Sequence, residues 1–235
     1  MRRILVTGAL GQIGSELTVR LRELYGESNV VASSKSVKDD QRELVEAGPF
    51  EIVDVTNREQ LAEVVTKYRI NTIIHLAAIL SAVGEANPHL AWDVNINGLY
   101  NVLEVARHEN CSVFTPSSIA AFGDSTPKDN TPQDTIQRPS TIYGVTKVAG
   151  ELLCDYYYHK FGVDTRGVRF PGLISYKTLP GGGTTDYAVH IYYEALHQKK
   201  YTSYIGPGTK MDMMYMPDAL DAIIQLMEAD PAKLI

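Results

Sequence analysis

The chain has 235 residues, of which 44% are hydrophobic and 21% are charged, as is ordinary for a globular protein with a substantial core. Its 22 basic and 28 acidic residues give a net charge of −6, and no Lys/Arg run is of the kind that follows a phosphate backbone. Nucleic acid is therefore not an expected partner. The opening "MRRILVTG" lacks the apolar core of a signal peptide, and no later run approaches membrane-spanning length.

The two cysteines point to a reducing compartment. Cys111 and Cys154 lack the spacing of metal ligands, and two cysteines cannot build a disulfide framework. Each is better explained as a small hydrophobic side chain in the core. We therefore expect a protein of the cytoplasm or of another reducing compartment, without a metal site and without contact with a membrane.

Short apolar strands alternate with helical stripes along the first 170 residues. The expected strands are Ile4 to Val6, Val30 to Ser33, Phe50 to Asp54, Thr72 to Leu76, Ser112 to Thr115 and Asp164 to Phe170. The expected helices are Ile13 to Leu24, Leu61 to Tyr68, about Pro88 to Glu109, and Tyr143 to Phe161, the last following a loop over 124 to 139. This alternation predicts an α/β fold with a Rossmann-like, doubly wound parallel sheet.

The stretch "TGALGQIG", residues 7 to 14, joins the first strand to the first helix and holds three glycines at intervals of three. In this position Gly8 permits a tight turn, Gly11 lets a pyrophosphate approach the backbone N–H groups, and Gly14 allows close packing of the helix. The spacing is one residue longer than that of the common dinucleotide fingerprint. The turn is expected to bind a dinucleotide.

Two readings remain open for the choice of cofactor. Dinucleotide-binding proteins place an acidic side chain roughly 20 residues beyond the glycines, where it binds the adenine ribose. That position is Ser34 here. Ser34 can hydrogen-bond a ribose hydroxyl, whereas the adjacent Lys35 could bind the 2′-phosphate of NADP. Asp54, which closes the third strand, is a candidate partner for the adenine amino group.

A second group of residues is typical of a catalytic site. "PSSIAAFG" begins just beyond the fifth strand and contains Ser118, and "TIYGVTKVAG" places Tyr143 and Lys147 on one helical face. A tyrosine of pKa about 10 can act as a base near neutrality only if that pKa falls by roughly 2–3 units. The ammonium of Lys147 favours the phenolate, and Ser118 can orient a substrate oxygen. Together the three side chains predict alcohol oxidation.

Beyond Pro171 the alternation stops. The segment "LPGGGTTDYA" precedes a helix near Tyr187 to Lys199, and a last helix follows Pro217 and Asp218. In doubly wound sheets ligands bind beyond the carboxyl ends of the strands, so the later segments are expected to cover that crevice. We therefore predict a dinucleotide-binding domain over 1–170 and substrate-binding segments over 171–235.

At these motifs the sequence resembles the extended short-chain dehydrogenase/reductase family, which includes nucleotide-sugar epimerases. The signatures are Thr7 to Gly14 and Tyr143 to Lys147. Five further stretches resemble the epimerase-type L-threonine 3-dehydrogenases, namely "LSAVGEANPHLA", "PSSIAAFG", "STIYGVTKV", "GGGTTDYA" and "MMYMPDAL". The resemblance implies NAD-dependent oxidation of the Cβ hydroxyl of L-threonine to 2-amino-3-ketobutyrate. The family commonly has Asp where Ser34 stands, and its members usually continue well past residue 235.

The resemblance also implies the roles of individual residues. The catalytic residues are Ser118, Tyr143 and Lys147. The cofactor-binding residues are Gly8, Gly11, Gln12, Ile13, Gly14, Ser34, Asp54, Val55, Leu76, Ala77, Ala78, Asn95, Tyr143, Lys147 and Pro171. The substrate-binding residues are Ser81, Ser118, Tyr143 and Thr184 or Thr185.

Two other functions remain as alternatives. A nucleotide-sugar epimerase or dehydratase would use the same tyrosine, but residues 171 to 190 contain no Arg to bind a uridine diphosphate. A non-catalytic NAD(P)-sensing protein would leave the Ser, Tyr and Lys unexplained. The helices over 88 to 109 and 140 to 161 imply a homodimer by analogy with related enzymes, with Leu153 and Tyr157 supplying apolar area.

Overall fold

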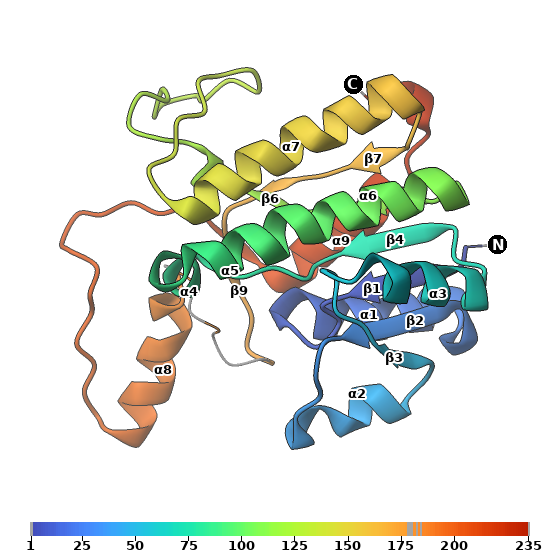
Figure 1. Ribbon diagram of the computed structural model, residues 1–235. Coiled ribbons are helices and arrows are strands. Elements are labelled where there is room, and N and C mark those ends of the chain that lie inside the picture. Colours follow the sequence, from blue (N-terminus) through green and yellow to red (C-terminus); the bar gives the residue numbers. More distant parts are fainter. Residues whose placement is uncertain (1, 178–180, 182, 184, 235) are drawn as a thin grey trace.

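The central sheet has six parallel strands, as the alternation predicts. The computed structural model describes residues 2–177, 181, 183 and 185–234. The strands are β1 (Ile4–Thr7), β2 (Val30–Ser34), β3 (Phe50–Ile52), β4 (Thr72–His75), β5 (Ser112–Phe114) and β7 (Thr165–Arg166). They lie in the order β3-β2-β1-β4-β5-β7 (Figure 1). The strand order reverses between β1 and β4, the point where doubly wound sheets bind their ligands.

Helices cover both faces of this sheet (Figure 1). They are α1 (Gln12–Tyr25), α2 (Arg42–Glu46), α3 (Arg58–Tyr68), α4 (Ser81–Ala86), α5 (Pro88–Trp92), α6 (Gly98–Glu109), α7 (Ile142–Phe161), α8 (Tyr187–His197) and α9 (Met216–Glu228). α3, α6 and α7 share one core with Leu5, whereas α1 and α9 share the other with Ile4 and Val6. β1 feeds both cores because successive side chains of a strand point to opposite faces.

The expected helix from Pro88 to Glu109 is continuous, but its middle is not α-helical. Residues Asp93–Asn97 form a π-helical turn between α5 and α6. The Asn87 side chain caps the start by accepting a hydrogen bond from the backbone N–H of Leu90. Asn110 ends the helix in the left-handed conformation, with φ 55°. Because π-helical turns are frequent at functional sites, this turn draws attention to Asn95, which it contains.

The expected strand from Asp164 to Phe170 divides into two. β7 belongs to the central sheet, whereas β8 (Arg169–Phe170) pairs with β6 (Ser117–Ser118) outside it. A Cβ on Gly167 would come within 2.8 Å of the carbonyl oxygen of Thr115, so only glycine allows the chain to pass there. Ser118 therefore lies on the short strand β6, outside the central sheet. A further parallel pair joins β9 (Gly172–Ile174) to β10 (Met213–Tyr215).

Some residues beyond 170 are buried in the core, whereas others lie away from the central sheet. Met216 and Ile223 of α9 are fully buried in the core shared with α1. α8, orange in Figure 1, stands apart from the central sheet. The boundary at 170 therefore does not separate two cores, and the division of roles across it stays a prediction. In the described ranges no helix is both long enough and apolar enough to span a bilayer.

Candidate active site

The glycine turn has the close packing that a phosphate cradle needs. Gly8 has φ 68°, and a Cβ on it would lie 2.6 Å from the backbone nitrogen of Ala77. A Cβ on Gly14 would lie 2.2 Å from the carbonyl oxygen of Gly8. A Cβ on Gly11 would meet only that same oxygen, at 3.2 Å, so the space beyond it is open. This open side lies at the N-terminus of α1, where backbone N–H groups attract phosphate. The turn therefore fits a dinucleotide.

The other predicted cofactor residues follow the carboxyl ends of neighbouring strands. Ser34 is the last residue of β2, Asp54 follows β3, and Leu76 to Ala78 follow β4 beside Gly8. Gln12 and Ile13 begin α1, and Pro171 lies between β8 and β9. Val55 is buried, and its Cγ2 would lie 2.8 Å from a Cβ on Gly98. The fold thus brings these residues to one edge of the sheet, and their role in binding stays a prediction.

The predicted selector Lys35 has a partner within the chain. Its ammonium lies 2.6 Å from a carboxylate oxygen of Asp54. The hydrogen bond to Asp54 raises the pKa of Lys35. Burial alone would raise the pKa of Asp54, but hydrogen bonds from Lys35 and Thr56 hold it below its usual value. Lys35 is therefore paired with Asp54 within the chain, although 72% of its side chain is exposed.

Asn95 connects two parts of the site. Its amide nitrogen donates to the carbonyl oxygen of Ile79 and to Oγ1 of Thr146, each at 3.1 Å. Its amide oxygen accepts the backbone N–H of Ile79 at 2.7 Å. These bonds fasten the segment after β4 to α7 next to Lys147. Asn95 therefore has a clear structural part, and a direct contact with cofactor stays a prediction.

The three predicted catalytic residues come together from β6 and α7. Ser118 lies beside Tyr143, close enough for its hydroxyl to affect the pKa of the phenol. The Lys147 ammonium lies 5.3 Å from the centre of the Tyr143 ring and donates to the carbonyl oxygen of Pro116 at 2.7 Å. Thr141 caps α7 by accepting the N–H of Gly144 at 3.0 Å, and the helix begins at Ile142, one residue before Tyr143. The spacing of Tyr143 and Lys147 on one face of this helix is as the sequence predicts.

Burial dominates the electrostatics of this group. It lowers the pKa of Lys147 to about 8, against an opposing effect of the Glu151 carboxylate. It raises the pKa of Tyr143, against an opposing effect of the hydrogen bond from Ser118. The chain by itself therefore does not depress the pKa of this phenol. Additional positive charge beside the ring is needed before Tyr143 can act as a base near neutrality.

The other predicted substrate-binding residues come from two segments, the start of α4 and the chain after β9. Ser81 begins α4, whose Glu85 accepts the backbone N–H of Ile142 at 2.7 Å, so this helix is fastened to the start of α7. A Cβ on Gly181 would lie 3.7 Å from Leu80, which places Gly181 beside α4. Thr185 packs on Gly172, the residue after Pro171. Thr184 lies outside the described residues.

Several other polar residues have structural partners. His75 is buried, accepts or donates a hydrogen bond with Thr7 at 2.8 Å, and has its pKa lowered to about 3 by burial. Tyr157 is buried and donates to Glu104 at 2.7 Å. Both thiols are free, and burial raises the pKa of Cys111 to about 11. Among the described residues no cluster of His, Cys, Asp or Glu could hold a metal ion.

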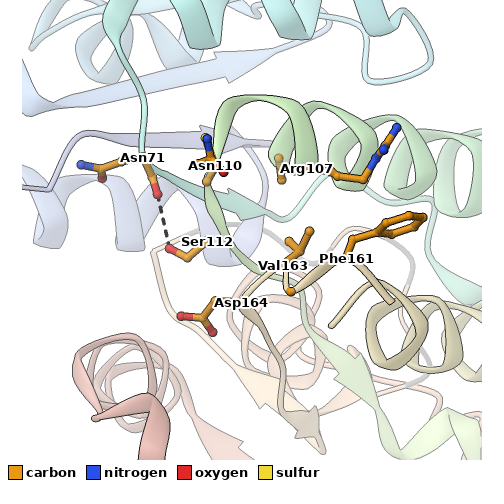
Figure 2. A pocket seen from close by; sticks show the side chains of 10 residues that line it. Asn71, Arg107, Asn110, Ser112, Phe161, Val163 and Asp164 are labelled. Carbon is orange, nitrogen blue, oxygen red and sulfur yellow. Dashed lines mark hydrogen bonds between the residues drawn. The ribbon is translucent and has the colours of Figure 1, made fainter. Parts of the chain in front are cut away.

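A cavity of about 290 Å³ lies at the opposite edge of the sheet (Figure 2). Ser112 begins β5, and Asn71 and Asp164 come directly before β4 and β7. Figure 2 shows Ser112 donating to the backbone carbonyl of Asn71. The cavity is therefore separated from the glycine turn and from Tyr143 by the length of the strands, and it is not part of the predicted site.

The sequence interpretation missed a carboxylate behind Lys147. Glu151 lies one helical turn farther along α7 and binds the guanidinium of Arg169, with oxygen–nitrogen distances of 2.7 to 3.2 Å. The signal was present in the spacing, because residues four apart on a helix share a face. The partner Arg169 could not be found in this way, since it comes from a different element.

Known proteins match this arrangement of strands and motifs. The family model described as "NAD dependent epimerase/dehydratase family" matches residues 4–234. The chain belongs to this family. An uncharacterized epimerase/dehydratase of Staphylococcus haemolyticus is 61% identical over all of this chain and 74% of its own length. The resemblance to the extended short-chain dehydrogenase/reductase family is thus confirmed, and the roles of the individual residues stay predictions.

Two solved structures add detail. An L-threonine dehydrogenase from Clostridium difficile is 66% identical with a TM-score of 0.96, covering all of this chain and 73% of that one. A monomeric L-threonine 3-dehydrogenase from a metagenome database is 47% identical with a TM-score of 0.93, covering 98% of this chain and 73% of that one. The chain therefore has the fold of these enzymes.

Proposed function

We propose that this member of the epimerase/dehydratase family is an NAD-dependent L-threonine 3-dehydrogenase, which oxidises the Cβ hydroxyl of L-threonine to give 2-amino-3-ketobutyrate. The observation that carries the proposal is the meeting of Ser118, Tyr143 and Lys147 at the edge of the sheet that holds the glycine turn. The 66% identity to a solved L-threonine dehydrogenase supports the choice of substrate.

Each of the three residues has a distinct task in this reaction. Ser118 orients the substrate hydroxyl through a hydrogen bond, and the Tyr143 phenolate takes the hydroxyl proton. Lys147 stabilises the phenolate with its positive charge. Gly8, Gly11 and Gly14 would hold the cofactor pyrophosphate at the start of α1. NAD, when bound, supplies the acceptor for the hydride that leaves Cβ.

The residues that we expect around the substrate have small side chains, which indicates a pocket for a small substrate. Ser81 and the loop from Gly181 to Asp186 offer hydroxyl and backbone groups that suit an ammonium and a carboxylate. Asp186 is itself buried and accepts the backbone N–H of Gly183 at 2.7 Å. A bulky nucleotide would call for a cationic side chain at its phosphates; residues 171–190 contain no Arg, and Lys177 in that range lies 3.9 Å from the Glu16 carboxylate. These features favour an amino acid over a sugar nucleotide.

Threonine is expected to reduce NAD when mixed with the purified protein. Serine, which lacks the methyl group, is expected to react with a kcat/KM lower by roughly 10–200-fold, the effect of one buried carbon. The measurement is nicotinamide absorbance with a panel of hydroxy-amino acids. Conversion of a uridine diphosphate sugar in place of threonine would assign the epimerase alternative, and cofactor binding without turnover of any substrate would assign a sensor.

NAD is expected to bind more tightly than NADP, because Asp54 engages Lys35, the side chain that could otherwise bind the 2′-phosphate of NADP. Asp54→Asn should shift the ratio of the two affinities toward NADP by about tenfold, the effect of one charge-assisted hydrogen bond. Calorimetric titration with both oxidised cofactors measures the ratio, which cancels any common loss of adenine binding.

The exposed Asp39 provides the control for this charge change. Asp39 pairs with Arg42 at 2.8 Å, and its side chain is 93% exposed. Asp39→Asn should leave the affinity ratio unchanged. Tighter binding of NADP by the unaltered protein would mean that Lys35 leaves Asp54 for the phosphate.

We further propose that the chain forms a homodimer through α6 and α7. Tyr157 is buried and cannot supply interface area, and Leu153 packs against the core. Exposed apolar side chains surround them instead, among them Tyr100, Leu152, Tyr156 and Tyr158. Light scattering at micromolar concentration should give twice the chain mass. A single-chain mass would put this protein with the similar structure that is described as monomeric.

A further inference from the structure

The carboxylate of Glu151 joins four segments of the chain behind the candidate active site. It accepts hydrogen bonds from Ser117 Oγ on β6, from Gln137 Nε2 at 2.9 Å, and from the Arg169 guanidinium on β8. Arg169 in turn donates to the carbonyl oxygen of Gln133 at 3.0 Å. β6, β8, the segment from 133 to 137 and α7 are therefore tied to one side chain.

This arrangement fixes the two elements that carry the catalytic residues. Ser117 precedes Ser118 on β6, and Ser117 is paired with Arg169 in the register of β6 and β8. Glu151 follows Lys147 by one turn of α7. The hydrogen bond that Ser117 donates to Glu151 consequently sets the distance between the strand of Ser118 and the helix of Tyr143.

Glu151 also determines the charge that Lys147 meets. On α7 Lys147 faces the Tyr143 ring, Glu151 and Cys154. From β4 it faces His75, which burial keeps neutral, and from the segment before β6 it meets the carbonyl of Pro116. Arg169 of β8 pairs with Glu151 on its other side, at 2.7 Å. Among these groups Glu151 is the one with a full negative charge.

We propose that Glu151 is a positioning residue of the active site, which fastens the strand of Ser118 to α7 and supplies the negative charge that keeps Lys147 protonated. The proposal rests on the function given above, since it assigns Glu151 to the task of Lys147 there. A purely structural Glu151 would need only its shape and its hydrogen bonds, whereas this role needs its charge. Glu151→Gln keeps the shape but removes the charge together with the acceptor at one oxygen, so the titration of Lys147, which a purely structural role would not move, separates the two.

The decisive measurement is the titration of Lys147 in the cofactor-free protein. Protein labelled with ¹³C at the lysine side chains is titrated by NMR, and the Lys147 signal is assigned by its loss in Lys147→Met. Glu151→Gln should lower the pKa of Lys147 by about one unit, a tenfold change in its protonation equilibrium. Asp155→Asn, an equal charge change at an exposed position one turn farther along α7, should leave it unchanged.

A second variant covers the case in which Glu151→Gln does not fold because Arg169 is left unpaired. The double variant Glu151→Gln with Arg169→Met removes both charges and should lower the pKa of Lys147 less, but in the same direction. An unchanged Lys147 titration in whichever of these variants folds would overturn the proposal. So would an equal shift in Asp155→Asn.

Activity gives an independent readout. In Glu151→Gln the fall of kcat on the alkaline side should begin about one pH unit lower, because Lys147 loses its proton there. An unaltered protein that does not oxidise threonine would refute the proposed function, and the NMR titration would still decide the role of Glu151. Threonine oxidation with an unshifted pH profile in Glu151→Gln would refute the positioning role and leave the function standing.

Discussion

Tyr143→Phe is expected to lower kcat with threonine by about 10²–10⁴, the usual effect of losing a general base. The substitution removes one hydroxyl and keeps the ring, so Ser118 and Lys147 lose a partner while the packing of α7 is preserved. NAD affinity should change far less than kcat, because this hydroxyl is a small part of the predicted cofactor contacts, which include the whole glycine turn. Stopped assays at saturating substrate give kcat, and calorimetry gives the NAD affinity.

Tyr192→Phe is the matched control for this prediction. Tyr192 lies on α8, outside the proposed dimer interface, and its side chain is 71% exposed. Loss of its hydroxyl should leave kcat within about twofold of the unaltered protein, since surface substitutions seldom change more than this. Near-normal turnover by Tyr143→Phe would show that another group takes the proton.

The sequence predicted most strands and helices well, and it predicted the helical spacing of Tyr143 and Lys147, because these are local signals. The apolar runs of β1, β2 and β4 and the spacing of Tyr143 and Lys147 depend on residues close together in the chain. The division of the strand after Asp164 could not be predicted in this way. It follows from the approach of Gly167 to Thr115, a contact between distant residues that leaves no period in the sequence.

The same distinction applies to the electrostatics of the site. The sequence suggested that Lys147 would depress the pKa of Tyr143, but burial has the larger effect and raises it. Likewise, Lys35 read alone suggests a phosphate ligand, while the fold sets it against Asp54 from a different strand end. Desolvation and pairing across elements depend on the assembled structure, so neither could be inferred from residue types alone.

Replacing each of two glycines of the turn by alanine is expected to affect different properties, namely stability for Gly14 and cofactor binding for Gly11. In Gly14→Ala the new Cβ would lie 2.2 Å from the Gly8 carbonyl oxygen and 2.8 Å from the Ala9 Cα. These are backbone atoms that cannot rotate away, so α1 must separate from the turn. We expect the free energy of unfolding to fall by about 3 kcal/mol, the upper range for overpacking, in chemical denaturation of the cofactor-free protein.

Gly11→Ala should instead spare the fold and impair cofactor binding. Gly11 has φ −80°, which alanine adopts without strain, and its Cβ would meet only the Gly8 oxygen, at 3.2 Å. The new methyl group would occupy the open side of the turn, where a pyrophosphate must approach the N–H groups of α1. We expect a loss of about 10–100-fold in NAD affinity by calorimetry, the effect of about 1–3 kcal/mol of crowding, with stability within about 1 kcal/mol of the unaltered protein. Unchanged NAD affinity in Gly11→Ala would mean that the dinucleotide does not lie on this turn, whereas equal destabilisation by both substitutions would mean that the turn has no open side.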